Sequence, residues 1–300
     1  MDFISIKNKR ILVTGGDGYL GTFLVNRLKR ENANVFVISL GEKEEENYFN
    51  VDITNFDELN EVIQKIRPEI IVHLAAYLSR ERDFSVYEKM EKINVQGTFN
   101  LLKALHNIDY SNFIFTSSSE IYGNNLSPFS ETQLPNPVSP YSLSKVHAET
   151  LIETFSAQYA KNYTILRLFN FYGPNMPEDY FIPQMINSLS RNQEFRMTKG
   201  EQKRDFMYVD DVLEALVLTI KSNGSHRDIY NVCSGVGTQL SELAEHINRV
   251  HTSNSKINIG ALPYRNNEVW EMIGDNSKIK SRMGWSPKIS ISEGIDLLID

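Results

Sequence analysis

Residues 10–21 read RILVTGGDGYLG, an apolar run that leads into three spaced glycines. The run Arg10–Thr14 is typical of a buried parallel strand, and Tyr19–Arg30 then carries apolar residues at helical spacing. Glycines between a strand and a helix let the backbone approach a pyrophosphate, and the helix N-terminus adds amide groups and a favourable dipole. The alternative is a tight turn that binds nothing. We predict a dinucleotide site built on Gly15, Gly18 and Gly21.

Strands and helices continue to alternate after this turn. Further strands are predicted at 34–40, 69–74, 112–116 and 163–169, with helices at 58–66, up to about 106, and from 140. This order implies a parallel sheet covered on both faces, which binds ligands at the carboxyl ends of its strands. The predicted fold class is α/β, a Rossmann-type doubly wound parallel sheet with a smaller C-terminal substrate-binding lobe. We assign 1–169 to the first lobe, with about 205–233 returning to its sheet, and 170–204 and 234–300 to the second.

The composition is that of an ordinary globule. The 300 residues are 41% hydrophobic and 23% charged, with a formal net charge of −7, which argues against a nucleic-acid surface. A single cysteine, Cys233, excludes an intramolecular disulfide framework, and no cysteine cluster offers metal ligands. The first residues lack the apolar core of a signal peptide, and no apolar run approaches the roughly 20 residues of a membrane helix. We expect a cytoplasmic protein with no bound metal.

The stretch SPYSLSK at 139–145 contains the candidate catalytic pair. Ser139 and Pro140 resemble an N-cap and a first helical position, so Tyr141 and Lys145 should share one helical face. A nearby cation favours a phenolate, so we expect Lys145 to lower the pKa of Tyr141. Tyr-x-x-x-Lys alone is weak, because surface pairs of this kind are common. Together with the glycine turn and the serines at 117–119, it predicts a hydride-transfer site.

Two positions bear on the adenosine end of the cofactor. Asp52 is a candidate acceptor for the adenine amine, and a carboxylate at a helix start is the alternative. Ser39 ends the second strand, about where a carboxylate that selects NAD would hold the ribose. A serine leaves room for a 2′-phosphate that Lys43 could reach, although the glutamates at 42 and 44–46 would repel it unless they point away. We expect NAD(P)(H), with NADPH favoured over NADH.

With these residues in hand, the chain resembles the extended short-chain dehydrogenase/reductase family of nucleotide-sugar enzymes. The resemblance runs from about residue 9 to 298 and includes TGGDGYLG, HLAA at 73–76, INVQGTFNLL at 93–102, SSSEIYG at 117–123, YSLSK, RLFNFYGP at 167–174, RDFMYVDD at 204–211 and GWSP at 284–287. It implies a Rossmann lobe for the cofactor, a smaller lobe for a nucleoside diphosphate sugar, and a homodimer. The implied cofactor residues, besides those above, are Tyr19, Leu20, Ile53, Leu74, Ala75, Ala76 and Asn94.

The resemblance also implies roles at the reacting centre. Ser118 would hydrogen-bond the sugar oxygen, Tyr141 would be its acid or base, and Lys145 would bind the nicotinamide ribose, supported by Asn94. Glu120 is a candidate acid or base, or a contact to a substrate hydroxyl. The implied substrate residues are Ser119, Asn170, Phe181 of the turn that ends at Pro183, Arg204 and Arg265. Guanidinium groups suit a diphosphate, whereas surface ion pairs are the alternative for the two arginines.

Three reactions fit this family, and they differ after the shared hydride transfer. Segments 118–123, 228–243 and 264–289 look most like 4-keto-6-deoxysugar reductases, whereas RLFNFYGPN and FIPQMI look more like epimerases or dehydratases. Ser119 stands where many dehydratases have an aspartate, although some members with elimination chemistry share the serine. We expect a reductase of the C4 ketone of an NDP-4-keto-6-deoxyhexose; the alternatives are a 4-epimerase with tightly bound NAD, then a 4,6-dehydratase.

Overall fold

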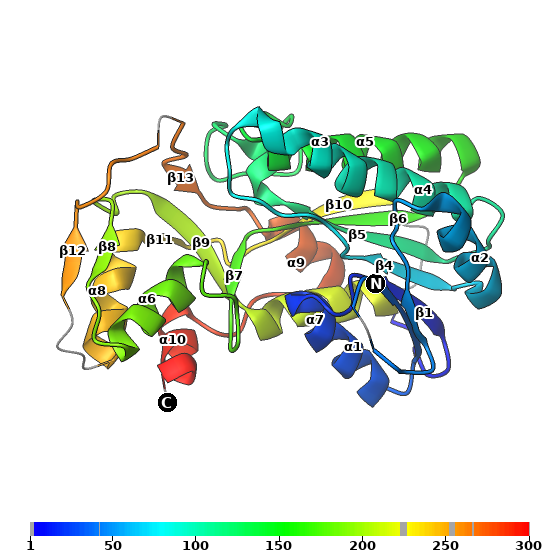
Figure 1. Ribbon diagram of the computed structural model, residues 1–300, viewed down its shortest axis with the longest axis horizontal. Coiled ribbons are helices and arrows are strands. Elements are labelled where there is room, and N and C mark those ends of the chain that lie inside the picture. The colour runs from blue at the N-terminus through cyan, green and yellow to red at the C-terminus, as the bar shows by residue number, and fades with distance from the viewer. Residues whose placement is uncertain (1–2, 42, 223–226, 252–255, 266, 300) are drawn as a thin grey trace.

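The fold is built on a seven-stranded parallel sheet (Figure 1). The structure is a computed structural model that describes residues 3–41, 43–222, 227–251, 256–265 and 267–299. The strand order is β10-β6-β5-β4-β1-β2-β3. The bounds are β1 Arg10–Thr14, β2 Asn34–Ser39, β3 Tyr48–Asn50, β4 Ile70–His73, β5 Asn112–Ser118, β6 Tyr163–Leu168 and β10 Arg227–Val232. The predicted α/β class with a doubly wound sheet is confirmed. The short strand β3 was not predicted, because three residues after an acidic loop carry no clear period.

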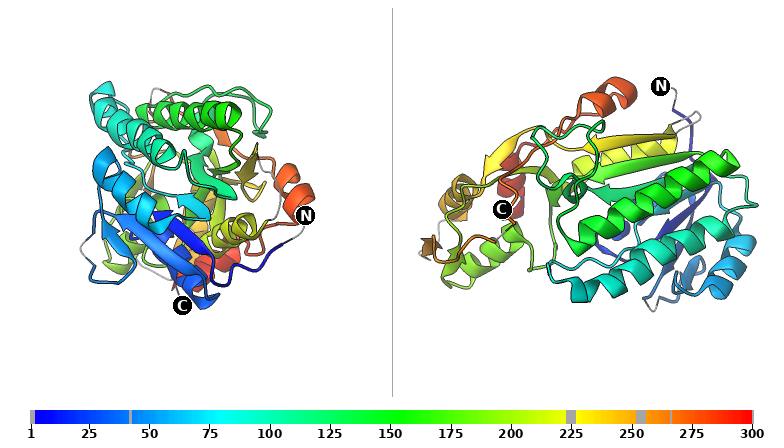
Figure 2. Two further views of the ribbon diagram at one scale, coloured as in Figure 1. Left: turned by 90° about the vertical axis from the view of Figure 1, so that its right-hand side faces the viewer. Right: turned by 90° about the horizontal axis from the view of Figure 1, so that it is seen from above.

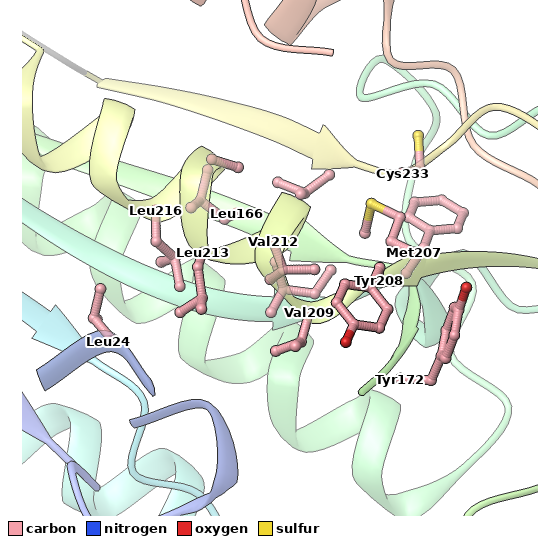
Figure 3. Close-up of a cluster of buried hydrophobic side chains, with 14 of the residues drawn as sticks. Leu24, Leu166, Tyr172, Met207, Tyr208, Val209, Val212, Leu213, Leu216 and Cys233 are labelled. Carbon is pink, nitrogen blue, oxygen red and sulfur yellow. The ribbon is translucent and has the colours of Figure 1, made fainter. Parts of the chain in front are cut away.

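Helices cover both faces of the sheet, as the two side views in Figure 2 show. On one face lie α1 (Tyr19–Arg30), α7 (Val209–Lys221) and α9 (Ser277–Met283); on the other lie α2 (Phe56–Ile66), α4 (Gly97–Ala104) and α5 (Pro140–Tyr159). Successive residues of a strand point to opposite faces, so Leu12 and Val13 enter two different buried clusters. Figure 3 shows part of the first cluster, with Leu24 of α1, Leu213 and Leu216 of α7 and Leu166 of β6 among its labelled members.

Four neighbouring strands end together at one edge of the sheet, and this edge positions the site. Their last residues are Thr14 of β1, Ser39 of β2, His73 of β4 and Ser118 of β5. The chain runs outward in one direction from β1 to β2 and β3, and in the other from β4 to β5 and β6. The strand order therefore reverses between β1 and β4, which is where open α/β sheets bind their ligands.

Beyond β6 the chain builds a second region, seen at the left of Figure 1. Its first sheet contains β7 (Asn170–Tyr172), β9 (Lys203–Tyr208), β11 (Gly237–Gln239) and β13 (Glu271–Met272), and β8 (Phe195–Met197) pairs with β12 (Ile257–Ile259). The helices are α6 (Phe181–Ser190), α8 (Leu240–His251) and α10 (Ile291–Ile299). We expected the chain to return to the main sheet from about 205, but β9 pairs with β7 instead, and β10 is the strand that returns.

The predicted long helical stretch between β4 and β5 is confirmed and runs from Phe84 to Ala104, although it is not one regular α-helix. It contains a 3-10 turn at Phe84–Val86, a short helix α3 (Tyr87–Met90), a π-helical segment at Glu91–Gln96 and then α4. The wide π turn carries Asn94, whose side chain reaches back to the loop after β4. In the part of the chain described, no helix combines the length and the apolar character needed to cross a membrane.

Candidate active site

A cavity of about 530 Å³ opens between the carboxyl edge of the main sheet and the second region. Most of the predicted catalytic and substrate residues line it, and they come from the ends of β1, β4 and β5, the start of α5, and the second region. The predicted residues in its wall are Tyr19, Leu20, Leu74, Ala76, Ser118, Ser119, Glu120, Tyr141, Lys145, Asn170, Phe181, Arg204 and Arg265. Residues up to 253 positions apart in the chain thus share one cavity, since the wall runs from Tyr19 to Met272.

The remaining predicted residues lie outside this cavity. They follow the same sheet edge, on the loops after β1, β2, β3 and β4 and in the π turn: Gly15, Gly18, Gly21, Ser39, Asp52, Ile53, Ala75 and Asn94. Asp52 accepts a hydrogen bond from the Thr54 amide at 2.8 Å through Oδ1, so one of its carboxylate oxygens is used at the approach to α2. Asn100 of α4 donates to the Ile53 carbonyl at 3.0 Å and holds this loop.

The loop between β1 and α1 fits a pyrophosphate. Gly15 has a φ of +68°, and an added Cβ there would lie 2.8 Å from the Ala75 backbone, so a side chain at this position has no room. Gly18 is the exposed N-cap of α1 and offers no side-chain cap, and Gly15 O is the nearest atom to a Cβ added there, at 3.2 Å. No side chain therefore caps the first amides of α1, and uncapped amides at a helix N-terminus are what a bound phosphate needs.

The end of β2 is occupied by a residue of the glycine loop. Asp17 reaches across so that its Oδ1 accepts a hydrogen bond from the Ser39 hydroxyl, and its Oδ2 accepts one from Tyr48 Oη at 3.1 Å. We expected Ser39 to leave room for a ribose 2′-phosphate; the structure places the Asp17 carboxylate beside this serine, a contact that the expectation did not include. Lys43 lies with Nζ 5.9 Å from the ring centroid of Tyr48, and Glu45 pairs with Lys29 at 2.7 Å. Glu42 lies outside the described residues.

Tyr141 stands at the first turn of α5, which begins with a complete capping box. The Ser139 hydroxyl accepts from the Ser142 amide at 3.1 Å, and the Ser142 hydroxyl accepts from the Ser139 amide at 3.0 Å. Burial, and then the negative charge of Glu120, raise the pKa of Tyr141. The expectation that Lys145 lowers this pKa was therefore wrong for the chain alone: Tyr141 is a protonated phenol at neutral pH.

Lys145 is buried one turn further along α5. Its Nζ donates to the Thr116 carbonyl at 2.8 Å and lies 5.8 Å from the ring centroid of Tyr141. Burial lowers the pKa of Lys145 to about 8, partly offset by the nearby carboxylate of Glu149. The ammonium is thus held against the backbone of β5, and its own desolvation is the reason it loses its proton more easily than a surface lysine.

A chain of hydrogen bonds that the sequence did not indicate joins the glycine loop to the catalytic helix. Thr14 Oγ1 lies 2.6 Å from His73 Nδ1, and His73 Nε2 lies 2.9 Å from Thr98 Oγ1, which donates to the Asn94 carbonyl at 2.6 Å. Because the Thr98 hydroxyl donates to the Asn94 carbonyl, it accepts from His73 Nε2. His73 Nδ1 then carries no proton and accepts from the Thr14 hydroxyl. Burial lowers the pKa of His73 to about 3, so the ring is neutral and relays hydrogen bonds rather than charge.

Asn94 extends this chain to α5. Its side chain accepts from the Tyr77 amide at 2.7 Å and donates to Ser144 Oγ at 2.9 Å, and Ser144 donates to the Tyr141 carbonyl at 2.8 Å. We expected Asn94 to support Lys145; the structure places its side chain against Ser144, the residue beside the lysine. Buried threonine and histidine side chains at strand ends carried no sequence signal of their own, since they resemble ordinary core residues.

The three polar residues after β5 have different surroundings. Ser118 Oγ accepts from the Glu120 amide at 3.1 Å and faces the cavity, whereas Ser119 is buried and donates to Met272 Sδ at 3.3 Å. Glu120 accepts from the Ser139 hydroxyl at 3.1 Å and lies 3.7 Å from the Arg82 guanidinium. Ser118, Glu120 and Tyr141 are thus among the polar groups that line this end of the cavity.

The opposite end of the cavity carries the predicted substrate arginines. Arg204 forms a largely buried ion pair with Glu268 and donates to the Lys203 carbonyl at 2.9 Å, and burial lowers its pKa. Arg265 lines the same wall and is exposed. Asn170 donates to the Asp205 carbonyl at 3.3 Å, and Phe181 packs edge-on against Phe195. Glu268 was not predicted, since one carboxylate in a loop gives no local signal.

Comparison with known proteins agrees with this arrangement. The model of the NAD dependent epimerase/dehydratase family matches residues 11–233. A putative UDP-glucose 4-epimerase of Methanocaldococcus jannaschii is 32% identical over 97% of this chain and 97% of its own. The human dTDP-D-glucose 4,6-dehydratase is 28% identical over 97% and 89%, and the GDP-6-deoxy-D-mannose reductase of Pseudomonas aeruginosa is 27% identical over 97% and 96%. The crystal structure of the UDP-glucose 4-epimerase of Thermotoga maritima with UDP-glucose superimposes with a TM-score of 0.90, at 30% identity and 97% coverage of both chains.

Proposed function

This chain belongs to the NAD dependent epimerase/dehydratase family, and on that premise we propose that it reduces the C4 ketone of a nucleoside diphosphate 4-keto-6-deoxyhexose. The observation that supports the proposal is that Ser118, Tyr141 and Lys145 line one end of the same cavity, where a hydroxyl and a phenol can both reach a substrate oxygen. Burial and the negative charge of Glu120 also raise the pKa of Tyr141, which favours its acid form. A ketone reduction needs a proton donor in its first step, whereas an oxidation begins with a base.

The residues of the chain have separate tasks in this reaction. Ser118 holds the carbonyl oxygen at C4 with its hydroxyl, and Tyr141 donates its proton to that oxygen as the carbon–oxygen double bond is reduced. The nicotinamide cofactor, when bound, supplies the hydride that reaches the carbon. Positioned general acid catalysis of this kind contributes about 10²–10⁴-fold to the rate. Lys145 lies behind Tyr141 to bind the nicotinamide ribose, and the amides of α1 hold the pyrophosphate.

The surroundings of Ser119 favour reduction over dehydration. Elimination needs an acid for the leaving hydroxyl as well as a base at the neighbouring carbon. Ser119 stands where many dehydratases have an aspartate, and its hydroxyl is buried and donates to Met272 Sδ. Glu120 could serve as the base; the other carboxylates of the wall, Glu81 and Glu268, come from other segments, and Glu268 is paired with Arg204.

We assign the nucleoside diphosphate to the second region, formed by 170–204 and 234–300. Arg204 and Arg265 reach the cavity from this region, and their guanidinium groups suit the two phosphates. The three relatives above are named for UDP, dTDP and GDP sugars, so their names leave the base open. We also propose a homodimer, because Phe84 and Phe99, between β4 and β5, are 64% and 43% exposed beside α5.

A 4-epimerase is the second candidate, favoured by the similarity to the epimerases of M. jannaschii and T. maritima. The two reactions differ in their use of the cofactor. A reductase consumes one NAD(P)H for each ketone, whereas an epimerase holds NAD and returns the hydride to the same substrate. Cofactor that copurifies in stoichiometric amount would therefore favour epimerisation.

The deciding experiment follows the nicotinamide absorbance after the enzyme is mixed with NADH or NADPH and 4-keto-6-deoxyhexoses linked to UDP, dTDP or GDP. We expect stoichiometric loss of the reduced cofactor with one of these substrates. We expect no loss with Tyr141→Phe, which keeps the ring and should leave the cofactor Kd nearly unchanged. No net loss with any substrate, in folded enzyme that binds the cofactor, would count against reduction and favour epimerisation.

A further inference from the structure

The Asp17 carboxylate lies where the sheet edge meets the adenosine end of a bound dinucleotide. Asp17 is the third residue after β1, and it contacts the last residue of β2 and the first residue of β3. In Rossmann folds, a carboxylate at the end of the second strand accepts hydrogen bonds from the ribose hydroxyls. Here the second strand ends in Ser39, which is not acidic, and the carboxylate beside it is that of Asp17, from the loop between β1 and α1.

The position of Asp17 is defined from several sides. The Ser39 hydroxyl donates to Oδ1 and Tyr48 Oη donates to Oδ2. A Cβ added at Gly41 would come within 2.4 Å of Oδ2, so the chain leaves space for the carboxylate there. The aspartate is partly buried, and each of its oxygens keeps a second lone pair for a further donor.

The charges around Asp17 do not favour a phosphate. Both of its hydrogen-bond partners are neutral hydroxyls, and among the described residues no lysine or arginine forms an ion pair with it. The basic side chain near this site, Lys43, lies over the Tyr48 ring with Nζ 5.9 Å from its centroid. Lys29 is already paired with Glu45 at 2.7 Å. A 2′-phosphate beside Asp17 would therefore face a carboxylate, and one of the two nearby lysines, Lys29, is already paired.

We propose that Asp17 selects NAD(H) against NADP(H): its carboxylate accepts hydrogen bonds from the adenosine ribose hydroxyls and repels a 2′-phosphate. The selecting charge then belongs to the glycine loop, and Ser39 and Tyr48 hold it in place. This inference rests on the proposed function, because it requires the dinucleotide to bind along this edge. It reverses the preference for NADPH that the serine at the strand end suggested.

Equilibrium titrations test the inference without any sugar substrate. The Kd of NADH and of NADPH is measured by nicotinamide fluorescence for the wild type and for Asp17→Asn, which keeps the shape and both hydrogen-bond partners but removes the charge. We expect the wild type to bind NADH at least about tenfold more tightly than NADPH, and Asp17→Asn to reduce that ratio by about tenfold, mainly through tighter NADPH binding. Asp57→Asn is the matched control, since it removes an exposed carboxylate in the first turn of α2 that has no assigned contact with the cofactor, and it should leave the ratio unchanged.

A second variant, in which the carboxylate is moved from position 17 to position 39, tests the same inference without relying on Asp17→Asn. In the double variant Asp17→Ser with Ser39→Asp, the carboxylate moves to the strand end, and we expect the preference for NADH to return. Raising the salt concentration should weaken the discrimination of the wild type, because screening reduces repulsion between two charges near the surface. Circular dichroism confirms that each variant is folded.

Three results would overturn the proposal. A wild type that prefers NADPH would contradict the assigned role directly. A ratio that is equal in the wild type and Asp17→Asn, with both proteins folded, would show that the carboxylate does not face the ribose. Failure of the folded wild type to bind either cofactor would overturn the dinucleotide site itself, and this last result separates failure of the proposed function from failure of the selection by Asp17.

Discussion

Replacing Lys145 by methionine should stabilise the protein at neutral pH while it removes activity. Burial lowers the pKa of Lys145 from 10.5 to about 8, so the folded protein binds the Lys145 proton more weakly than the unfolded chain does. At pH 7 the lysine is charged in both states, and the folded protein bears the cost of burying that charge. Between these two pKa values the unfolded chain binds more protons, and the free energy of unfolding rises with pH at about 1.36 kcal/mol per unit. From about pH 8 to about pH 9.5 the wild type should therefore gain about 2 kcal/mol relative to Lys145→Met.

Urea denaturation at pH 7 and pH 9.5 measures this difference. Lys161→Met is the matched control, because Lys161 also donates to a backbone carbonyl, Ile108 O at 2.7 Å, but is only partly buried. Its stability relative to the wild type should not change between the two pH values. A difference between wild type and Lys145→Met that stays constant over this range would refute the reasoning that desolvation depresses the pKa of this lysine.

Two further predictions concern the buried and the substrate-facing arginines. Glu149→Gln should lower the free energy of unfolding by about 3–5 kcal/mol, since it leaves Arg167 buried without its bidentate partner. Glu178→Gln is the control, because Glu178 and its partner Arg191 are both 57% exposed, and it should lower the free energy of unfolding by less than about 1 kcal/mol. Equal losses in urea denaturation would contradict this. Arg204→Gln should raise the KM of the nucleotide sugar by at least about tenfold and leave the Kd of the cofactor unchanged; a parallel loss of cofactor affinity would argue against its place at the diphosphate.

The elements predicted most accurately are those whose signals are local. The strand at Arg10–Thr14 and the helix at Tyr19–Arg30 have the predicted bounds, and the Ser139–Pro140 start of α5 carries the expected cap. Apolar runs, glycines at a turn and capping residues act within a few positions of one another, so their effect can be read along the chain. The family signature added the order of the motifs, which places their residues along one sheet edge.

The tertiary structure decided every property that depends on which elements meet. Asp17 reads as a loop residue in the sequence, and its role follows from contact with β2 and β3, which lie 22 and 31 residues further along. The pKa of Tyr141 is raised by burial and by Glu120, which is 21 residues away in the chain. The pairing of β9 with β7 and of Arg204 with Glu268 likewise joins distant segments. The sequence by itself determined the family, the α/β class and the candidate catalytic pair, because these depend on local order. The place of the Asp17 carboxylate, the pKa of Tyr141 and the ion-pair partner of Arg204 depend on distances between segments that are far apart in the sequence. Only the folded chain sets those distances.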